Sequence, residues 1–346
     1  MKHHAPLDGL RAIAVSAVVI YHLSGSLLPG GWIGVDIFFV LSGFLITRIL
    51  LAELKSAASV NLGAFYTRRF LRLMPAFWLM LICTSALYVM SPAARMTHIE
   101  SAWTSAIYLM NWNRAFSWFG DDGGYLGHTW SLATEEQFYL LWPFLLMALF
   151  RVRRIAPAII LGLAAASLLW RMSLLQHGAN VERAYNGFDT HADSILMGCA
   201  LGFVRLSPRL ARVASLTSTV PVLILGLLFL KADLWMKLRL EIGITAGAIC
   251  AAWMIAASFS RGYFSAFLSW RPLVYTGQIS YGWYLWHLPF LYLASKVFHI
   301  PDRFVFVPLS YGVAALSYHV VERPILSLRD RFRPTSQSEE AGSALA

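Results

Sequence analysis

The chain has 346 residues, of which 58% are hydrophobic and 13% are charged, whereas a soluble globular protein is roughly half apolar and about a quarter charged. The mean hydropathy of +0.59 points the same way. So few charges cannot cover a water-exposed surface of this size, which excludes a soluble globular enzyme. The net charge is +10, but no soluble basic face presents it, so we expect no nucleic-acid partner.

Apolar blocks of helical length follow one another along the chain. About ten of them are long enough to count as transmembrane candidates, which predicts an all-α integral membrane bundle. The first block resembles a signal peptide, but the next block follows within a few residues, which favours a span. The predicted spans cover residues 10–28, 32–51, 73–90, 129–149, 155–174, 191–206, 218–232, 242–259, 273–295 and 304–321.

Lys and Arg are more numerous on the side of the predicted bundle that also carries both ends of the chain. The positive-inside rule therefore predicts that both termini are cytoplasmic. We expect the membrane domain to span residues 1–330. Residues 331–346 are rich in Ser, Glu and Ala with no apolar period, which predicts a disordered cytoplasmic tail. The long segment 91–128 is expected to be a partly helical outer loop that covers a site.

Cys83, Cys199 and Cys250 each lie inside an apolar segment and share no close spacing. Neither a disulfide framework nor a thiolate metal site is indicated, and we predict no metal. The motifs of P-loop, dinucleotide-binding, zinc and nucleophile-elbow proteins are absent from the sequence.

Two ionisable residues, Arg11 and His22, lie in the first predicted span. Eleven helical residues at about 100° each place both side chains on one face, about 16 Å apart along the axis. An ionisable group inside a membrane requires a partner or a function. One interpretation is an inner cation joined by one helix to a catalytic imidazole near the outer side. The alternative is an interfacial Arg and a hydrogen-bonded packing histidine.

Asp36 opens the second predicted span. Because the link between the first two spans is short, we expect Asp36 at a depth similar to that of His22, where its carboxylate could orient the imidazole. The alternative is an acid favoured by the helix macrodipole. In the fourth span, Glu135 and Tyr139 are four residues apart and share a face, whereas Glu136 is turned aside.

Seven short stretches, in order, resemble the motifs of the acyltransferase family 3 membrane O-acyltransferases. Each is weak alone, but together they extend from residue 7 to residue 324. They are 7–15 (LDGLRAIAV), 21–22 (YH), 34–44 (GVDIFFVLSGF), 69–72 (RFLR), 128–139 (HTWSLATEEQFY), 279–287 (ISYGWYLWH) and 321–324 (VERP).

The resemblance implies transfer of an acyl group, usually acetyl, from cytoplasmic acyl-CoA to a hydroxyl group beyond the bacterial plasma membrane. Acyl-CoA would be a co-substrate, with no permanently bound cofactor. The family's essential Arg and His correspond to Arg11 and His22. Its Arg-x-x-Arg motif corresponds to Arg69 and Arg72, which are suited to CoA phosphates. Simple positive-inside anchoring is the alternative role for this pair.

Further site residues follow from the same resemblance. Glu135 matches the family acid and is expected to orient the acceptor, to exchange a proton or to act as a counterion. Candidates for substrate or structural support are Trp130, Ser131, Tyr139, His287 and Glu322. His191 stands where the family commonly has Arg, so the role of that position is open. His22 would either deprotonate the acceptor hydroxyl or become transiently acylated.

The expected acceptor is a sugar hydroxyl of a surface or secreted glycan, including a lipid-linked precursor, with polysaccharide biosynthesis proteins as expected partners. The aromatic residues Trp103, Trp112, Trp118 and Tyr125 suit carbohydrate stacking or an interfacial belt. The sequence shows no hydrolase-like domain of the kind that some relatives carry, so we expect this membrane domain or a partner to deliver the acceptor. The alternatives are acylation of a macrolide-like metabolite and proton-coupled transport, which often shows two similar halves that are not evident here.

Overall fold

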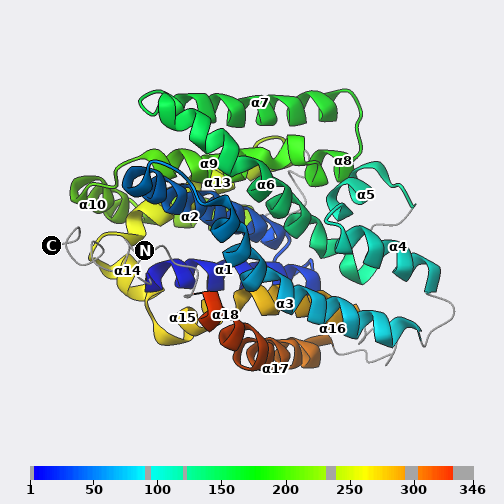
Figure 1. Ribbon diagram of the computed structural model, residues 1–346. Helices are drawn as coiled ribbons and strands as arrows, with labels where there is room; N and C mark the ends of the chain where they lie inside the picture. Colours follow the sequence, from blue (N-terminus) through cyan, green and yellow to red (C-terminus); the bar gives the residue numbers. More distant parts are fainter. Residues whose placement is uncertain (1–3, 90–94, 120–122, 231–238, 293–302, 330–346) are drawn as a thin grey trace.

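The computed structural model describes residues 4–89, 95–119, 123–230, 239–292 and 303–329. Every regular element in these ranges is helical, as predicted (Figure 1). The α-helices are α1 (Ala5–Leu23), α2 (Gly34–Ala57), α3 (Leu62–Val89), α4 (Arg95–Ala106), α5 (Met110–Phe116), α6 (Trp130–Arg151), α7 (Ala156–Gln176), α8 (Val181–Asn186), α9 (Phe188–Phe203), α10 (Pro208–Leu216), α11 (Thr219–Leu230), α13 (Ile244–Ser258), α14 (Tyr263–Leu268), α15 (Arg271–Gln278), α16 (Ser280–Tyr292), α17 (Phe306–Ser317) and α18 (Arg323–Arg329). Short 3-10 turns are η1 (Gly31–Ile33), η3 (Gly124–Thr129) and η7 (Arg303–Val305), and π-helical turns are η5 (Arg239–Gly243) and η8 (Tyr318–Glu322).

Five helical segments of the described chain are long and apolar enough to cross a membrane. They are Ala5–Leu23, Gly31–Ala57, Leu62–Ala86, Ala156–Gln176 and Leu240–Ser258. Helices α10 and α11, bent by 51°, make a sixth if they form one broken span. The expectation of about ten spans is therefore confirmed only in part.

The remaining predicted spans differ for two physical reasons. Helix α6 has 22 residues, but Glu135, Glu136 and Gln137 lower its hydropathy. Helices α9 and α16 have only 16 and 13 described residues, which is short of the roughly 20 that a bilayer requires. Helix α17 continues without a break through η8 into α18, but Tyr318, His319, Glu322 and Arg323 lower the hydropathy of that segment. The ends of three predicted spans, 90, 231–232 and 293–295, and the predicted tail 331–346 lie outside the described residues.

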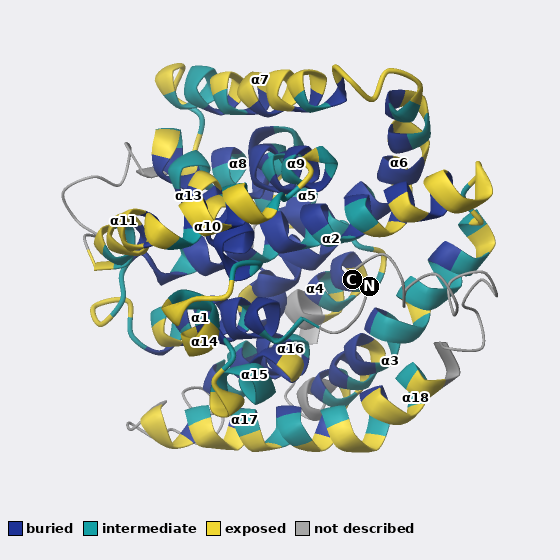
Figure 2. Ribbon diagram, turned by 90° about the vertical axis from the view of Figure 1, so that its left-hand side faces the viewer, coloured by how far each residue is buried: buried dark blue, intermediate teal, exposed yellow. Residues whose placement is uncertain are grey.

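Helices α1, α2 and α9 form the buried centre, while α7 and α17 lie at opposite edges with one face exposed (Figure 2). Helix α2 packs closely along α9 because glycines stand at the crossing. A Cβ atom on Gly198 would lie 2.0 Å from the carbonyl oxygen of Val40, and one on Gly43 would lie 2.1 Å from that of Ile195. Small residues allow this close approach of membrane helices.

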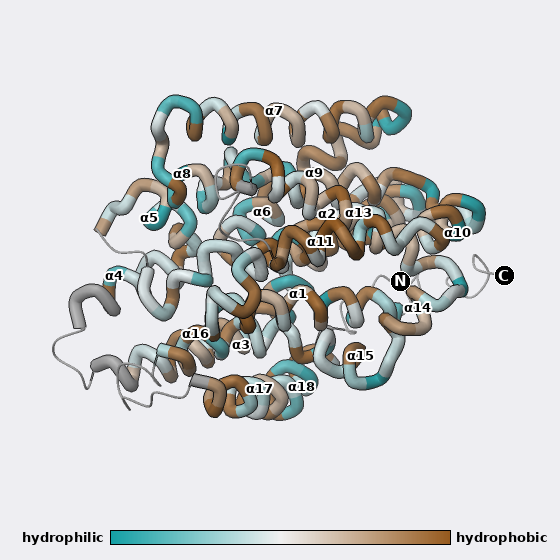
Figure 3. Tube along the Cα trace, turned by 180° about the vertical axis from the view of Figure 1, so that it is seen from behind, coloured by the Kyte–Doolittle hydropathy of each residue, from teal (hydrophilic) through white to brown (hydrophobic). Residues whose placement is uncertain are grey.

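Helix α11 is almost uniformly hydrophobic, and apolar residues recur along α7 at the edge of the bundle (Figure 3). A surface of this kind suits contact with lipid rather than water. The exposed apolar side chains of α7 and α11 include Leu161, Leu163, Leu169, Val220, Leu223, Leu227 and Leu230.

The segment between α3 and α6 is partly helical, as predicted, with α4, α5 and η3 in its described parts. The hydroxyl groups of Ser105 in α4 and Thr129 in η3 lie 2.8 Å apart. Thr129 also donates to the carbonyl of Leu126 at 2.8 Å. These bonds fix η3 against α4 just before α6 begins, and they hold His128 inside the bundle.

Candidate active site

Two histidines from distant parts of the chain meet inside the bundle. Nδ1 of His22, near the end of α1, lies 3.2 Å from Nε2 of His287 in α16. The two ring centroids are 5.0 Å apart. Nδ1 of His22 also lies 3.0 Å from the carbonyl oxygen of Val18, and Nδ1 of His287 lies 2.6 Å from that of Tyr284. The structure thus brings together two of the predicted site residues.

His128 completes what we call the histidine cluster (His22, His128 and His287). Its ring centroid lies 5.4 Å from that of His287, and its Nε2 donates to the carbonyl of Leu285 at 3.1 Å. Its Nδ1 is buried and has no hydrogen-bond partner in the described part of the chain. His128 was missed as a site residue because it lies in η3, where helical periodicity gives no signal.

The hydroxyl group of Tyr284 links the histidine cluster to α6. The hydroxyl of Tyr284 donates to the carbonyl of His128 at 2.8 Å. The hydroxyl of Ser131 lies 2.6 Å from that of Tyr284. Ser131, predicted as a support residue, therefore contacts the side chain that fixes the backbone at His128.

A second group of polar residues, the arginine–glutamate cluster, surrounds the middle of α6. The guanidinium carbon of Arg69 lies 3.9 Å from the centre of the Tyr139 ring, a cation–π contact worth about 0.5–2 kcal/mol. The Tyr139 hydroxyl is hydrogen-bonded to that of Ser42. Glu135 lies beside both hydroxyls and within the electrostatic field of Arg69 and Arg72. Glu135 and Tyr139 therefore lie on a common face of α6, as predicted, and both belong to this cluster.

One face of α6 joins the two clusters. Ser131, Glu135 and Tyr139 follow at intervals of four residues and so line up along about 12 Å of helix. Tyr284 contacts Ser131 and lies within the electrostatic field of Glu135. A stripe of polar side chains on α6 therefore lies between Arg69 and the histidine cluster.

Glu322 and Arg72 extend the polar region away from the histidines. Glu322, in η8, accepts a hydrogen bond from Ser317 at 3.3 Å and lies within the electrostatic field of Arg72. A Cβ atom on Gly282 would lie 3.0 Å from a Glu322 carboxylate oxygen, so the glycine leaves room for the carboxylate beside α16.

Arg11 has a local partner on its own helix. Its guanidinium lies 2.9 Å from the Asp8 carboxylate. The Arg11 side chain keeps 19% of its surface exposed, so it is available to a ligand approaching the start of α1.

Asp36 bonds to His191 and not to His22, which corrects the expectation that it orients His22. Its Oδ1 lies 2.7 Å from Nε2 of His191 and accepts from Ser194 at 2.6 Å. Asp36 and Gly43 are seven residues apart on α2 and share a face. Because Gly43 packs on α9, Asp36 on the same face of α2 is also directed toward α9.

The charge beside Asp193 comes from another helix. Arg171 in α7 donates to both carboxylate oxygens of Asp193 at 2.9 Å, and both side chains are fully buried. Thr245 also bonds to Asp193. His191 therefore does not have to supply the positive charge beside Asp193, and it pairs with Asp36 instead.

Trp130 packs rather than binding through its indole edge. Its ring contacts those of Phe39, Tyr185 and His191, with centroids 5.9, 4.7 and 5.3 Å away. In this way it holds the aromatic wall beside the Asp36–His191 pair.

Aromatic rings stack beside α5. Trp112 and Phe116 lie 5.7 Å apart and nearly parallel, and Phe116 stacks on Trp118 at 6.5 Å. Arg183 lies over Phe116 at 5.3 Å and pairs with Asp189. Burial acts to raise the pKa of Asp189, but hydrogen bonding and the positive charge of Arg183 outweigh it and hold that pKa below its ordinary value.

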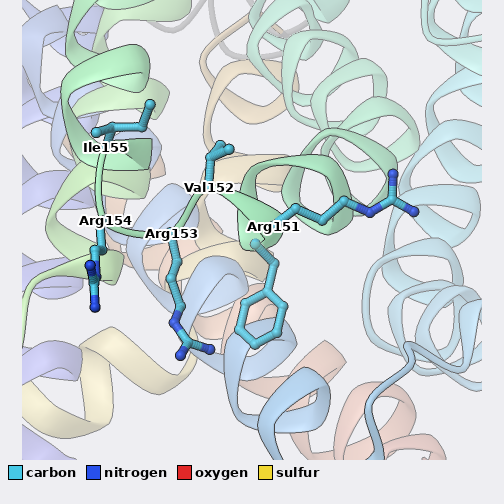
Figure 4. Close-up of a pocket in the computed structure, with 6 residues that line it drawn as sticks. Arg151, Val152, Arg153, Arg154 and Ile155 are labelled. Atoms are coloured by element: carbon cyan, nitrogen blue, oxygen red, sulfur yellow. The ribbon is translucent and has the colours of Figure 1, made fainter.

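A hollow of about 640 Å³ lies at the turn between α6 and α7, lined by residues 150–155. Figure 4 shows that Arg151 points away from Arg153 and Arg154. The three guanidinium groups do not converge on one anion. No group of three or more His, Cys, Asp or Glu side chains in the described ranges is arranged to hold a metal ion.

A helical bundle with exposed apolar side chains on its outer helices and a partly buried stripe of histidine, hydroxyl, carboxylate and guanidinium groups is typical of a membrane-embedded enzyme. A family model for an acyltransferase domain matches residues 5–319. The chain belongs to this family, acyltransferase family 3, so the predicted family and the predicted class of enzyme, an acyltransferase, are confirmed.

Curated relatives match nearly the whole chain. Peptidoglycan O-acetyltransferase OatA of Listeria monocytogenes is 38% identical over an alignment of 347 positions, which covers 94% of this chain and 56% of that protein. The putative peptidoglycan O-acetyltransferase YrhL of Bacillus subtilis is 36% identical, with 94% and 55% covered. O-acetyltransferase OatA of Staphylococcus aureus is 33% identical, with 92% and 56% covered. The chain spans about half the length of these relatives, and no solved structure matches it.

Proposed function

We propose that the chain transfers an acetyl group from cytoplasmic acetyl-CoA to a hydroxyl group of a cell-wall glycan on the outer side of a bacterial plasma membrane. The observation that carries this proposal is the polar stripe on α6, which joins Arg69 to the histidine cluster. The names of the relatives support peptidoglycan as the acceptor. They favour a glycan over a macrolide-like metabolite and over transport.

The donor would bind at the arginine end of the stripe. Arg69 and Arg72 are one turn apart on α3, and guanidinium groups suit the phosphates of CoA. The topology that we propose has about ten spans and both termini in the cytoplasm, which puts these arginines on the side where CoA occurs. The pantetheine arm would then extend along α6 toward His22.

The chemistry has two balanced routes at His22. In direct transfer, His22 removes the proton of the acceptor hydroxyl while its oxygen attacks the thioester carbonyl; the C–S bond breaks, and the CoA thiolate receives the proton. In the covalent route, His22 attacks the thioester and releases CoA thiolate. The acceptor hydroxyl then attacks the acyl-imidazole and restores His22, while the proton of the hydroxyl passes to the CoA thiolate.

The proposal is tested with membranes that contain equal amounts of wild-type protein, His22→Gln or Arg69→Gln, supplied with radiolabelled acetyl-CoA and peptidoglycan fragments. Arg154→Gln, which removes an exposed charge outside the stripe, is the matched control. We expect label on the glycan with wild type and Arg154→Gln, and little with the other two variants. Label that is equal in all four samples, or absent from glycan with wild type, would overturn the proposal.

A further inference from the structure

We infer that His287 is a positioning residue that holds His22 in the tautomer with an unprotonated Nε2, so that Nε2 of His22 is the reacting atom. This inference rests on the proposed function, in which His22 receives a proton or an acyl group. It assigns a role to His287, for which the sequence offered only substrate or structural support.

The proton on His287 is located by a backbone carbonyl. Nδ1 of His287 lies 2.6 Å from the carbonyl oxygen of Tyr284. A carbonyl oxygen only accepts hydrogen bonds, so Nδ1 of His287 carries the proton. A neutral imidazole has one N–H, and Nε2 of His287 is therefore an acceptor. The side chain is fully buried, which favours the neutral ring.

The proton on His22 follows in the same way. Nδ1 of His22 faces two acceptors, the carbonyl oxygen of Val18 at 3.0 Å and Nε2 of His287 at 3.2 Å. Nδ1 must therefore be the N–H of a neutral His22, and Nε2 keeps its lone pair. Nε2 has no hydrogen-bond partner among the described residues, and the side chain is only partly buried.

Of the two acceptors of Nδ1 of His22, only Nε2 of His287 is not already used by a hydrogen bond within α1. In an α-helix each carbonyl accepts from the amide four residues later, so the carbonyl of Val18 is already used by the amide of His22. When Nε2 gains a proton or an acyl group, the ring becomes positive and its Nδ1–H becomes a stronger donor. The lone pair of His287 then stabilises the charged ring and keeps it aligned.

Two amide substitutions separate this role from packing. In His287→Gln, the side-chain oxygen reaches about the place of Nε2 and can still accept from His22. In His287→Asn, the shorter amide reaches about the place of Nδ1 and can still donate to Tyr284, but His22 loses its acceptor. A packing role would rank the two polar variants alike, whereas the positioning role predicts that only Gln rescues.

The experiment measures carbethoxylation of His22 by diethyl pyrocarbonate, followed by mass spectrometry of the peptide. His177 is the internal reference, since it is exposed and its Nδ1 lies 2.7 Å from the carbonyl of Ser173, which leaves its Nε2 reactive by the same logic. We expect wild type and His287→Gln to react at similar rates relative to His177. We expect His287→Asn to react about threefold to tenfold more slowly at His22, with kcat for acetyl transfer lowered about 10- to 100-fold and KM for acetyl-CoA unchanged.

Equal reactivity of the Gln and Asn variants would overturn the inference. The labelling does not need acetyl transfer, so it decides the inference even if wild type fails to acetylate glycan. If either variant does not fold, the labelling experiment is replaced by nitrogen NMR of wild type and His22→Gln, both prepared with isotope-labelled histidine. The signals lost in His22→Gln are expected to show a protonated Nδ1 and an unprotonated Nε2, and a protonated Nε2 would overturn the inference.

Discussion

The guanidinium carbon of Arg69 lies 3.9 Å from the centre of the Tyr139 ring, and this contact joins α3 to the helix that carries Glu135. The Tyr139 hydroxyl bonds to Ser42 in α2, so three helices meet where the proposed donor site begins. The contact makes Arg69 one end of a polar stripe whose other end is the histidine cluster.

Arg69→Gln is expected to raise KM for acetyl-CoA by about tenfold or more, because hydrogen bonds from a charged donor contribute about 1.5–3 kcal/mol. Arg69→Lys keeps the charge but loses the planar fork, so its effect should be intermediate. Initial rates at varied acetyl-CoA and constant glycan measure this. A rise in KM for glycan instead, with KM for acetyl-CoA unchanged, would place Arg69 at the acceptor.

Tyr284→Phe is expected to lower kcat about tenfold, because it removes the bond to the carbonyl of His128 and the contact with Ser131. Tyr66→Phe is the matched control, since it too loses a hydroxyl bond to a backbone carbonyl, that of Leu140. Both variants should fold to the same amount. Equal activity of the two would show that the link between α16 and α6 has no part in the reaction.

Arg171→Leu should destabilise the protein by about 3–5 kcal/mol, because it leaves the buried Asp193 carboxylate without its partner. Replacing both Arg171 and Asp193 by Leu should cost less than Arg171→Leu alone, since no unpaired charge remains. The apparent Tm in detergent is the measurement, with the exposed Arg154→Leu as control. A double variant less stable than Arg171→Leu would argue that the pair contributes net stability.

Gly198→Ala is expected to prevent normal packing of α9 on α2, because the new Cβ would lie 2.0 Å from the Val40 carbonyl oxygen. Gly162→Ala in α7 is the control, since nothing lies within 4 Å of its Cβ position. The yield of monodisperse protein after extraction should fall sharply in the first variant and stay unchanged or rise in the second. A normal yield for Gly198→Ala would contradict the close contact.

Features within one helix were predictable from the sequence, whereas pairings between helices were not. Glu135 and Tyr139 share a face because four residues make about one helical turn. The bond of His191 to Asp36 spans 155 positions and depends on the way in which α2 packs against α9. The short link after α1 did not indicate the face of α2 on which Asp36 lies.

The same limit explains why His128 was missed and why the number of spans was predicted only in part. The position of His128 depends on the bonds of η3 to α4 and α16, which leave no periodic signal in the sequence. The apolar block 273–295 was predicted as one span, but the chain turns inside it, where α15 ends at Gln278 and α16 begins at Ser280. Hydropathy alone detects the apolar block and not the break.

Transfer between the two sides of a membrane tests the central claim most directly. Vesicles with the protein in one orientation would carry glycan fragments inside and radiolabelled acetyl-CoA outside, on the face that bears Arg69. We predict label on the enclosed glycan with wild type and none with His22→Gln. Label that requires acetyl-CoA and glycan on the same side, or label that persists in His22→Gln, would contradict a reaction at His22 supplied across the bundle.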